Sequence, residues 1–188
     1  MQDLDARKKK FRTIIIVYPF ALIGIAAIIN TIAFGVTPIS PALPSESVVT
    51  AAIISAVILL ATHSWLMTRT ELTRLRYDLY STPEEWAARG RDPKKASQFG
   101  LSELARHHNA HRNMTENTVH FAVLAGLLSI VSPSQWAAEL WFLGFALGRL
   151  AHGFCFVTGN DGARGIAMSV SLMSLYGMAT YLLLALFA

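Results

Sequence analysis

The sequence predicts an all-α integral membrane protein with five membrane-spanning helices. Its 188 residues are 53% apolar and 15% charged, whereas an ordinary soluble domain has about 45–50% apolar and about 25% charged residues. The apolar residues are gathered in long runs. The length of each run is close to or above the roughly 20 residues that a helix needs to cross the hydrocarbon core. Helices suit these runs because every backbone polar group must be satisfied inside lipid. The single cysteine, Cys155, excludes an intrachain disulfide.

Five runs are expected to span the membrane, and segments rich in Pro, Gly, Ser and Asp separate them. They cover residues 13–35, 48–67, 101–131, 136–157 and 166–188. A basic segment, residues 1–12, precedes the first run, and a polar loop at about residues 77–100 separates the second from the third. The alternative for the first run is a cleaved signal peptide. Its apolar part is longer than the about 7–15 residues of such a peptide, so we expect a retained helix.

The basic residues are unevenly distributed between the two sides of the membrane. Lys and Arg occur in residues 1–12 and 69–100, whereas the loops at 36–47 and 132–135 contain none. The positive-inside rule then predicts a cytoplasmic N-terminus and a C-terminus on the opposite side. This asymmetry accounts for the net charge of +4 without nucleic-acid binding. We expect a bacterial inner membrane rather than an endoplasmic reticulum membrane.

The third run combines a polar first half with an apolar second half. Its polar residues recur at helical spacing and are expected to share one face: Arg106, Asn109, Asn113, Glu116 and His120. Glu116 lies about 22 Å along this helix, where a lone charge costs at least about 2.5–3.5 kcal/mol. We therefore expect Glu116 to face protein and to pair with a cation. The candidate cations are Arg74, Arg106, Arg112, Arg149, His152 and Arg164.

Three interpretations of this polar face remain open. The polar residues can simply hold the helices together. They can line an arginine-rich cavity for a small anionic ligand, because arginine binds carboxylates with a bidentate fork. They can also include a metal site on Glu103, His107 and His111, which are spaced at i, i+4 and i+8. The clustered histidines are too few for a membrane di-iron centre, so we expect no metal.

Three segments of the chain resemble motifs of one membrane-protein family. They are RTELTRLRYDLYSTPEEWAARGR at 69–91, ARHHNAHRNMTEN at 105–117 and GRLAHGFCFVTGNDGAR at 148–164. Their order and spacing resemble the R-x-R, R-x-x-R-A-H-x-N-x-x-E and G-R-x-x-H-x-x-x-Y…R motifs of the MAPEG family, the membrane-associated proteins in eicosanoid and glutathione metabolism. The resemblance covers the last four runs. It implies a four-helix membrane domain at residues 48–188, to which residues 13–35 add an N-terminal transmembrane helix.

The resemblance also implies a homotrimer that binds glutathione between neighbouring subunits, near the cytoplasmic side. Arg164 would be the catalytic cation that stabilises the glutathione thiolate. A nearby cation lowers the pKa of a thiol from about 8.5, which makes the nucleophile available at neutral pH. The implied function is a glutathione-dependent membrane transferase or peroxidase acting on hydrophobic electrophiles. The other implied glutathione-binding residues are Arg74, Arg112, Asn113, Glu116 and His152.

Four positions depart from the family pattern. Asn109 stands where several members have an arginine. Phe156 and Met168 stand where tyrosines are expected, and Gly165 stands where a prostaglandin E synthase has a serine. These departures leave open whether catalysis survives. The alternative function is a non-catalytic lipid-binding protein or a scaffold of a membrane complex, which could contact another membrane protein through residues 13–35.

Two further expectations concern packing. Trp136 and Trp141 are expected to anchor the outer end of the fourth run at the membrane interface. Ser169, Ser171 and Ser174 are expected to pack against a neighbouring helix.

Overall fold

The computed structural model describes the backbone of residues 2–188 and the side chains from Arg7 onward. All regular structure in these residues is helical. The α-helices are α1 (Gln2–Ile28), α2 (Glu46–Arg76), α3 (Pro83–Ala88), α4 (Gln98–Ile130), α5 (Gln135–Thr158) and α6 (Asp161–Ala185). A π-helical segment, η1 (Ile29–Phe34), continues α1, and a short 3-10 turn, η2 (Pro93–Lys95), precedes α4.

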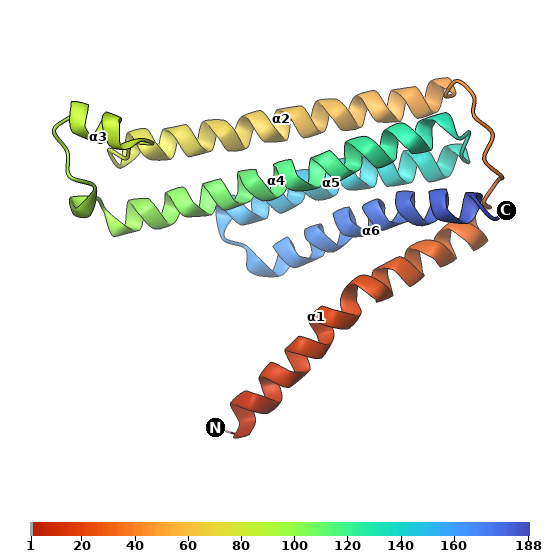
Figure 1. Cartoon of the computed structure of the whole chain (residues 1–188), viewed down its shortest axis with the longest axis horizontal. Helices are drawn as coiled ribbons and strands as arrows, with labels where there is room; N and C mark the ends of the chain where they lie inside the picture. Colours follow the sequence, from red (N-terminus) through yellow and green to blue (C-terminus); the bar gives the residue numbers. More distant parts are fainter. Residues whose placement is uncertain (1) are drawn as a thin grey trace.

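The predicted membrane helices are present. Four stretches in the described residues are long and apolar enough to cross a membrane: Arg7–Phe34, Glu46–Arg76, Gln135–Thr158 and Asp161–Ala185. Helix α4 corresponds to the remaining predicted run. It has 33 residues and packs against α2, α5 and α6 in the same bundle (Figure 1). It is not among the four apolar stretches because its first half is polar.

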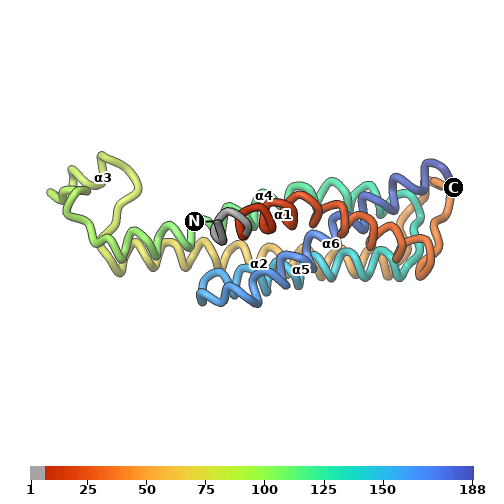
Figure 2. The backbone as a smooth tube through the Cα atoms, turned by 90° about the horizontal axis from the view of Figure 1, so that it is seen from below, coloured from red at the N-terminus to blue at the C-terminus, as the bar shows by residue number. Residues whose placement is uncertain are grey.

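Helices α2, α4, α5 and α6 form an antiparallel four-helix bundle, and α1 lies outside it (Figure 1). Helices α2 and α4 extend beyond the turn between α5 and α6 and carry the segment with α3 at their tips (Figure 2). We call this end of the bundle the basic end, because residues 69–95 and the first turn of α6, which contains Arg164, lie there and the basic start of α1 lies toward the same side. The opposite end, the outer end, holds residues 35–45 and 131–134, which contain no Lys or Arg.

Helices α5 and α6 approach closely because small residues face each other. A Cβ atom on Gly148 would lie 2.9 Å from the backbone nitrogen of Ser171, and one on Gly144 would lie 2.8 Å from the Ser174 hydroxyl. Ser171 and Ser174 are buried, which confirms their predicted packing role. Small residues at helix contacts are the usual means by which membrane helices pack without a hydrophobic driving force.

The N-terminal helix is joined to the bundle by a buried polar cluster. The Asn30 side-chain amide in η1 donates to the Gly177 carbonyl over 2.8 Å and to the Thr180 hydroxyl over 2.9 Å. Its oxygen accepts a hydrogen bond of 2.9 Å from the Trp141 indole. Nearer the basic end, the Tyr18 hydroxyl donates to Ser169 over 2.6 Å. The additional helix therefore packs on its own chain, along α6, and diverges from it toward the N-terminus (Figure 1).

The expectation for Trp141 is wrong. Its side chain is 2% exposed and its ring fills the space beside Gly177, where a Cβ atom would come within 2.4 Å of the indole. A neighbouring helix that the apolar pattern could not identify, η1, supplies its hydrogen-bond acceptor. Trp136 is 70% exposed at the outer end, as an interface anchor requires.

Candidate functional site

An arginine lies in the interior of the bundle. Arg149 on α5 is 1% exposed. Its guanidinium donates a hydrogen bond to the side-chain oxygen of Asn113 on α4 and lies 3.2 Å from Nδ1 of His152, one turn further along α5. Longer contacts reach Met168 Sδ at 3.3 Å and Ser171 Oγ at 3.4 Å on α6. Arg149 thus connects three helices through polar contacts.

No carboxylate compensates this charge within the described residues. The ion pairs there do not include Arg149, and its buried Nε atom has no hydrogen-bond partner. A buried charge without a counter-charge is costly, and more so at membrane depth. The pairing of Glu116 with Arg149, one of the predicted options, does not occur within one chain. The interior consequently has an excess of positive charge that a bound anion would neutralise.

A row of contacts continues from His152 toward the basic end. The Phe156 ring lies 5.6 Å from the His152 ring, and the Arg164 guanidinium lies 4.8 Å from the Phe156 ring centroid. Arg164 also pairs with Asp161 over 3.0 Å in the first turn of α6. The aromatic face of Phe156 therefore orients Arg164 although it lacks the hydroxyl of the tyrosine expected at this position. We call Asn113, Arg149, His152, Phe156 and Arg164 the interior arginine cluster.

Two predicted site residues lie on the outward face of α4. The side chains of Arg112 and Glu116 are 72% and 63% exposed and form an ion pair of 3.9 Å, so the predicted pairing of Glu116 with a cation is met by Arg112. The expectation that Glu116 faces protein is not met within one chain. The reason is the rotation of α4, which buries a different set of residues against the bundle: His107, Ala110, Met114, Phe121, Ala125 and Leu128.

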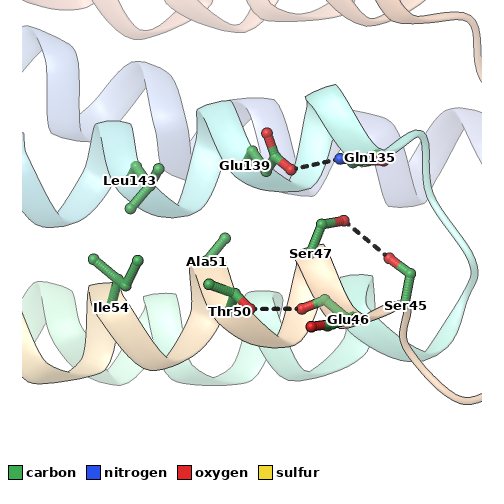
Figure 3. A pocket seen from close by; sticks show the side chains of 9 residues that line it. All are labelled: Ser45, Glu46, Ser47, Thr50, Ala51, Ile54, Gln135, Glu139 and Leu143. Carbon is green, nitrogen blue, oxygen red and sulfur yellow. Dashed lines mark hydrogen bonds between the residues drawn. The ribbon is translucent and has the colours of Figure 1, made fainter.

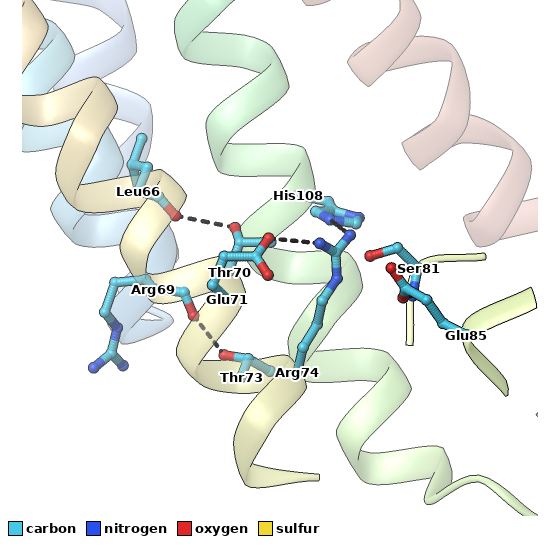
Figure 4. A network of polar contacts seen from close by, with 9 residues as sticks. All are labelled: Leu66, Arg69, Thr70, Glu71, Thr73, Arg74, Ser81, Glu85 and His108. Atoms are coloured by element: carbon cyan, nitrogen blue, oxygen red, sulfur yellow. Dashed lines mark hydrogen bonds and ion pairs between the residues drawn. The ribbon is translucent and has the colours of Figure 1, made fainter. Parts of the chain in front are cut away.

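Arg74 lies apart from these residues, at the basic end of α2. Its guanidinium contacts Glu71 on the same helix and lies 3.0 Å from His108 Nε2 on α4 (Figure 4). With Ser81 and Glu85, which lie beside it in Figure 4, it lines a cavity of about 450 Å³. Its Nε atom is buried without a partner. In the hydrogen bonds and ion pairs of the described part of the chain, Arg74 does not join the other predicted site residues.

The residues considered for a metal site are not gathered. Glu103 pairs with Arg106 over 3.2 Å, His107 is buried against α2, and His111 contacts His63. Within the described residues, no group of three or more His, Cys, Asp or Glu side chains is arranged to hold a metal ion.

A separate cavity opens between α2 and α5 at the outer end (Figure 3). It has a volume of about 590 Å³ and is lined by Glu46, Gln135 and Glu139 together with small polar and apolar side chains. No basic residue and none of the predicted site residues lines it. Its acidic character makes it unsuited to an anionic ligand.

The structure therefore brings together three of the six predicted site residues: Asn113, His152 and Arg164. It adds Arg149, which the sequence suggested only as a partner for Glu116. The signal that could have identified Arg149 is its spacing of three residues from His152, which places both on one face of α5.

Comparison with protein families gives a match between residues 50–184 and the model of the MAPEG family. The matched range includes α3, α4 and α5, most of α2 and α6, and all six predicted site residues. Helix α1 and η1 lie outside it. No curated protein matches the chain.

Proposed function

The chain belongs to the MAPEG family, and we propose that it is a glutathione-dependent membrane transferase or peroxidase for hydrophobic electrophiles. The family comprises membrane proteins of glutathione and eicosanoid metabolism, and the chain is a multi-pass membrane protein of this class. The site residues, the reaction and the oligomeric state are our proposals.

One observation carries the proposal: the buried charge of Arg149 has no carboxylate partner in the described residues. Glutathione has two carboxylates and one ammonium group, so it is an anion at neutral pH. Its thiolate form carries a further negative charge. Arg149 and Arg164 are two cations in one row of contacts, with His152 and Phe156 between them, and Asn113 on α4 accepts a hydrogen bond from Arg149. This composition suits an anionic, peptide-like ligand.

In the proposed reaction, Arg164 stabilises the glutathione thiolate after the thiol proton leaves to solvent. A cation beside a thiol lowers its pKa from about 8.5. In transfer, the sulfur forms a bond to an electrophilic carbon, and the leaving group departs with the bonding electron pair. In peroxide reduction, the thiolate sulfur attacks the terminal peroxide oxygen, the O–O bond breaks, and the alkoxide takes up a proton and leaves as an alcohol. The resulting sulfenic acid reacts with the thiol of a second glutathione to give glutathione disulfide and water. Arg149 acts as a positioning residue, because it holds Asn113 and His152.

The exposed pair Arg112 and Glu116 supports a site shared between subunits. Both side chains lie well along a helix of membrane length, and charged groups at such depth face protein or a water-filled cavity. Packing of this face against another copy of the chain would provide that environment. A homotrimer would then allow Glu116 to receive the glutathione ammonium group and Arg112 and Arg74 to bind its carboxylates. We place the basic end in the cytoplasm, where glutathione is available.

The test is calorimetric titration of glutathione into the purified protein in detergent. Saturable binding is expected, and Arg164→Ala and Glu116→Gln are each expected to weaken it by at least tenfold. Glu139→Gln is the matched control, because it removes a carboxylate in the separate outer cavity and should leave binding unchanged. Absence of binding at millimolar glutathione, in protein shown to be folded and trimeric, would refute the proposal.

The alternative is a non-catalytic lipid-binding or scaffold protein. It is favoured by the apolar residues at Phe156, Gly165 and Met168 and by the exposed apolar side chains of α1, including Ile15, Ile16 and Phe20. Activity assays distinguish the two functions. Glutathione binding without turnover of 1-chloro-2,4-dinitrobenzene or cumene hydroperoxide would favour the non-catalytic protein.

A further inference from the structure

Two histidines from different helices meet on the flank of the bundle. Nε2 of His63 on α2 lies 3.4 Å from Nε2 of His111 on α4. The ring centroids are 4.4 Å apart and the ring planes are inclined by 49°. The rings therefore lie obliquely side by side and do not meet head-on. Neither residue belongs to the interior arginine cluster, and the proposed function does not use them.

The pair is accessible from the side of the bundle. Both rings are half-buried. His63 also lines a groove of about 410 Å³ between α2 and α4, whose walls include Thr115, Val119 and Phe121. The Thr115 hydroxyl is directed to the backbone carbonyl of His111. A small ion could therefore reach His63 from the groove, and the two obliquely placed rings would have to turn so that both nitrogens face it.

We propose that His63 and His111 form a two-histidine site for a divalent transition-metal ion, Zn²⁺ or Cu²⁺. Imidazole nitrogen is a preferred ligand of both ions. A tetrahedral zinc ion binds nitrogen at about 2.0–2.1 Å, which separates two ligand nitrogens by about 3.3–3.4 Å. The observed separation of 3.4 Å matches this distance, whereas it is longer than the about 2.7–3.2 Å usual for a hydrogen bond from nitrogen.

The site would have two protein ligands and an open side. No third His, Cys, Asp or Glu joins the pair within the described residues, so water would occupy the remaining positions. Such a site binds an exchangeable ion more weakly than a four-ligand structural zinc site. Because its ligands come from α2 and α4, the bound ion would connect these two helices and stabilise the folded protein by mass action.

The experiment uses tag-free, metal-stripped protein in detergent. Zinc is titrated by calorimetry, and copper is examined by electron paramagnetic resonance. The expected result is one ion per chain, with nitrogen coupling from two imidazoles in the copper spectrum. His63→Gln and His111→Gln are each expected to weaken binding by at least tenfold. His120→Gln is the matched control, since it changes an exposed histidine of the same helix and should leave binding unchanged.

A rescue variant separates loss of ligand from loss of structure. His63→Cys supplies a thiolate in place of the imidazole and is expected to bind zinc, whereas His63→Gln is not. Absence of binding at submillimolar zinc and copper, or equal binding by wild type and both glutamine variants, would overturn the proposal. Because His111 adjoins Arg112 on α4, the two proposals are separated with variants on other helices. His63→Gln on α2 should lose zinc binding and keep glutathione binding, whereas Arg164→Ala on α6 should do the reverse.

Discussion

The indole N–H of Trp141 on α5 donates a hydrogen bond of 2.9 Å to the side-chain oxygen of Asn30, which belongs to the N-terminal helical segment outside the four-helix bundle. The Asn30 amide donates two further bonds to α6. Asn30 is 0% exposed and Trp141 is 2% exposed. Every polar atom of both side chains is thus satisfied away from water and lipid, which fixes the position of the additional helix along the bundle.

Removing either partner of this bond is expected to destabilise the protein. Trp141→Phe keeps an aromatic ring but leaves the Asn30 oxygen without a donor, at a cost of about 1–3 kcal/mol. In a double-mutant cycle with Asn30→Leu, we expect a coupling energy above the average of about 0.6 kcal/mol between membrane helices and near the maximum of about 1.7 kcal/mol, because the pair is completely buried. Unfolding in mixed detergent micelles measures it. Trp136→Phe, at an exposed tryptophan, should have little effect, and strictly additive losses would contradict the coupling.

Arg149→Met is expected to separate stability from ligand binding. The substitution removes a buried charge that has no counter-charge in the described residues, and replacing buried charges by apolar groups is often neutral or stabilising by about 1–4 kcal/mol. The loss of the hydrogen bond to Asn113 opposes this gain by about 1–3 kcal/mol. We therefore expect the free energy of unfolding without ligand to be unchanged or higher than in wild type.

The same variant should lose its response to glutathione. At glutathione concentrations of about 100 times the dissociation constant, the free energy of unfolding of the wild type should rise by about 2.7 kcal/mol. The free energy of unfolding of Arg149→Met should hardly change. Thermal unfolding with and without glutathione measures both quantities. Arg149→Lys serves as the control, because it keeps the charge and should keep part of the response. Strong destabilisation of Arg149→Met together with a full glutathione response would show that Arg149 is only a structural residue.

The helices could be predicted because their signals are local. A run of apolar residues and a change to turn-forming residues are both contained in a short window, so the boundaries of α5 differ from the predicted 136–157 by only one residue at each end. The packing of Ser171 and Ser174 follows similarly from their small size. By contrast, Trp141 could not be assigned to the core, because its acceptor, Asn30, is 111 residues away in the chain.

The contacts of the polar residues on α4 were harder to predict, because a polar stripe on a helix covers more of its surface than one neighbouring helix contacts. Asn113 and Glu116 are three residues apart, so their side chains point about 60° apart around the helix axis. Only the residues along one side of this polar stripe face the interior of the bundle. Asn113 accepts a hydrogen bond from Arg149, whereas Glu116 is exposed. Sequence periodicity gives the stripe but not the rotation of the helix, which depends on packing against α2, α5 and α6.

Phe156→Tyr is expected to raise catalytic efficiency with glutathione. The new hydroxyl would extend from a ring that already lies between His152 and Arg164, and a hydrogen bond to a charged ligand contributes about 1.5–3 kcal/mol. This corresponds to an increase in kcat/KM of at least tenfold. Phe156→Leu is the comparison, because it removes the ring that orients Arg164, a cation–π contact of about 0.5–2 kcal/mol, and should lower kcat/KM. Equal rates for all three proteins would exclude position 156 from the site.

The exposed charges of α4 predict a self-associating protein. If Arg112 and Glu116 face another copy of the chain, replacing both with leucine removes polar contacts between subunits and makes the face compatible with lipid. We expect native mass spectrometry in detergent to detect trimers for wild type and a larger monomer fraction for the double variant. The physical reason is that the polar face costs at least about 2.5–3.5 kcal/mol per charge when it is exposed to lipid, whereas the leucine face costs nothing.

A matched control distinguishes loss of these contacts from a general effect of added leucines. Glu46→Leu and Glu139→Leu remove two carboxylates of the outer cavity, on α2 and α5, and should leave the trimer intact. A wild type that is monomeric under all mild detergents would contradict the prediction, since Arg112 and Glu116 would then have to tolerate lipid. In that case the double leucine variant should be more stable than wild type and should remain monomeric. Its only effect would be to remove charges from the lipid-facing side of α4.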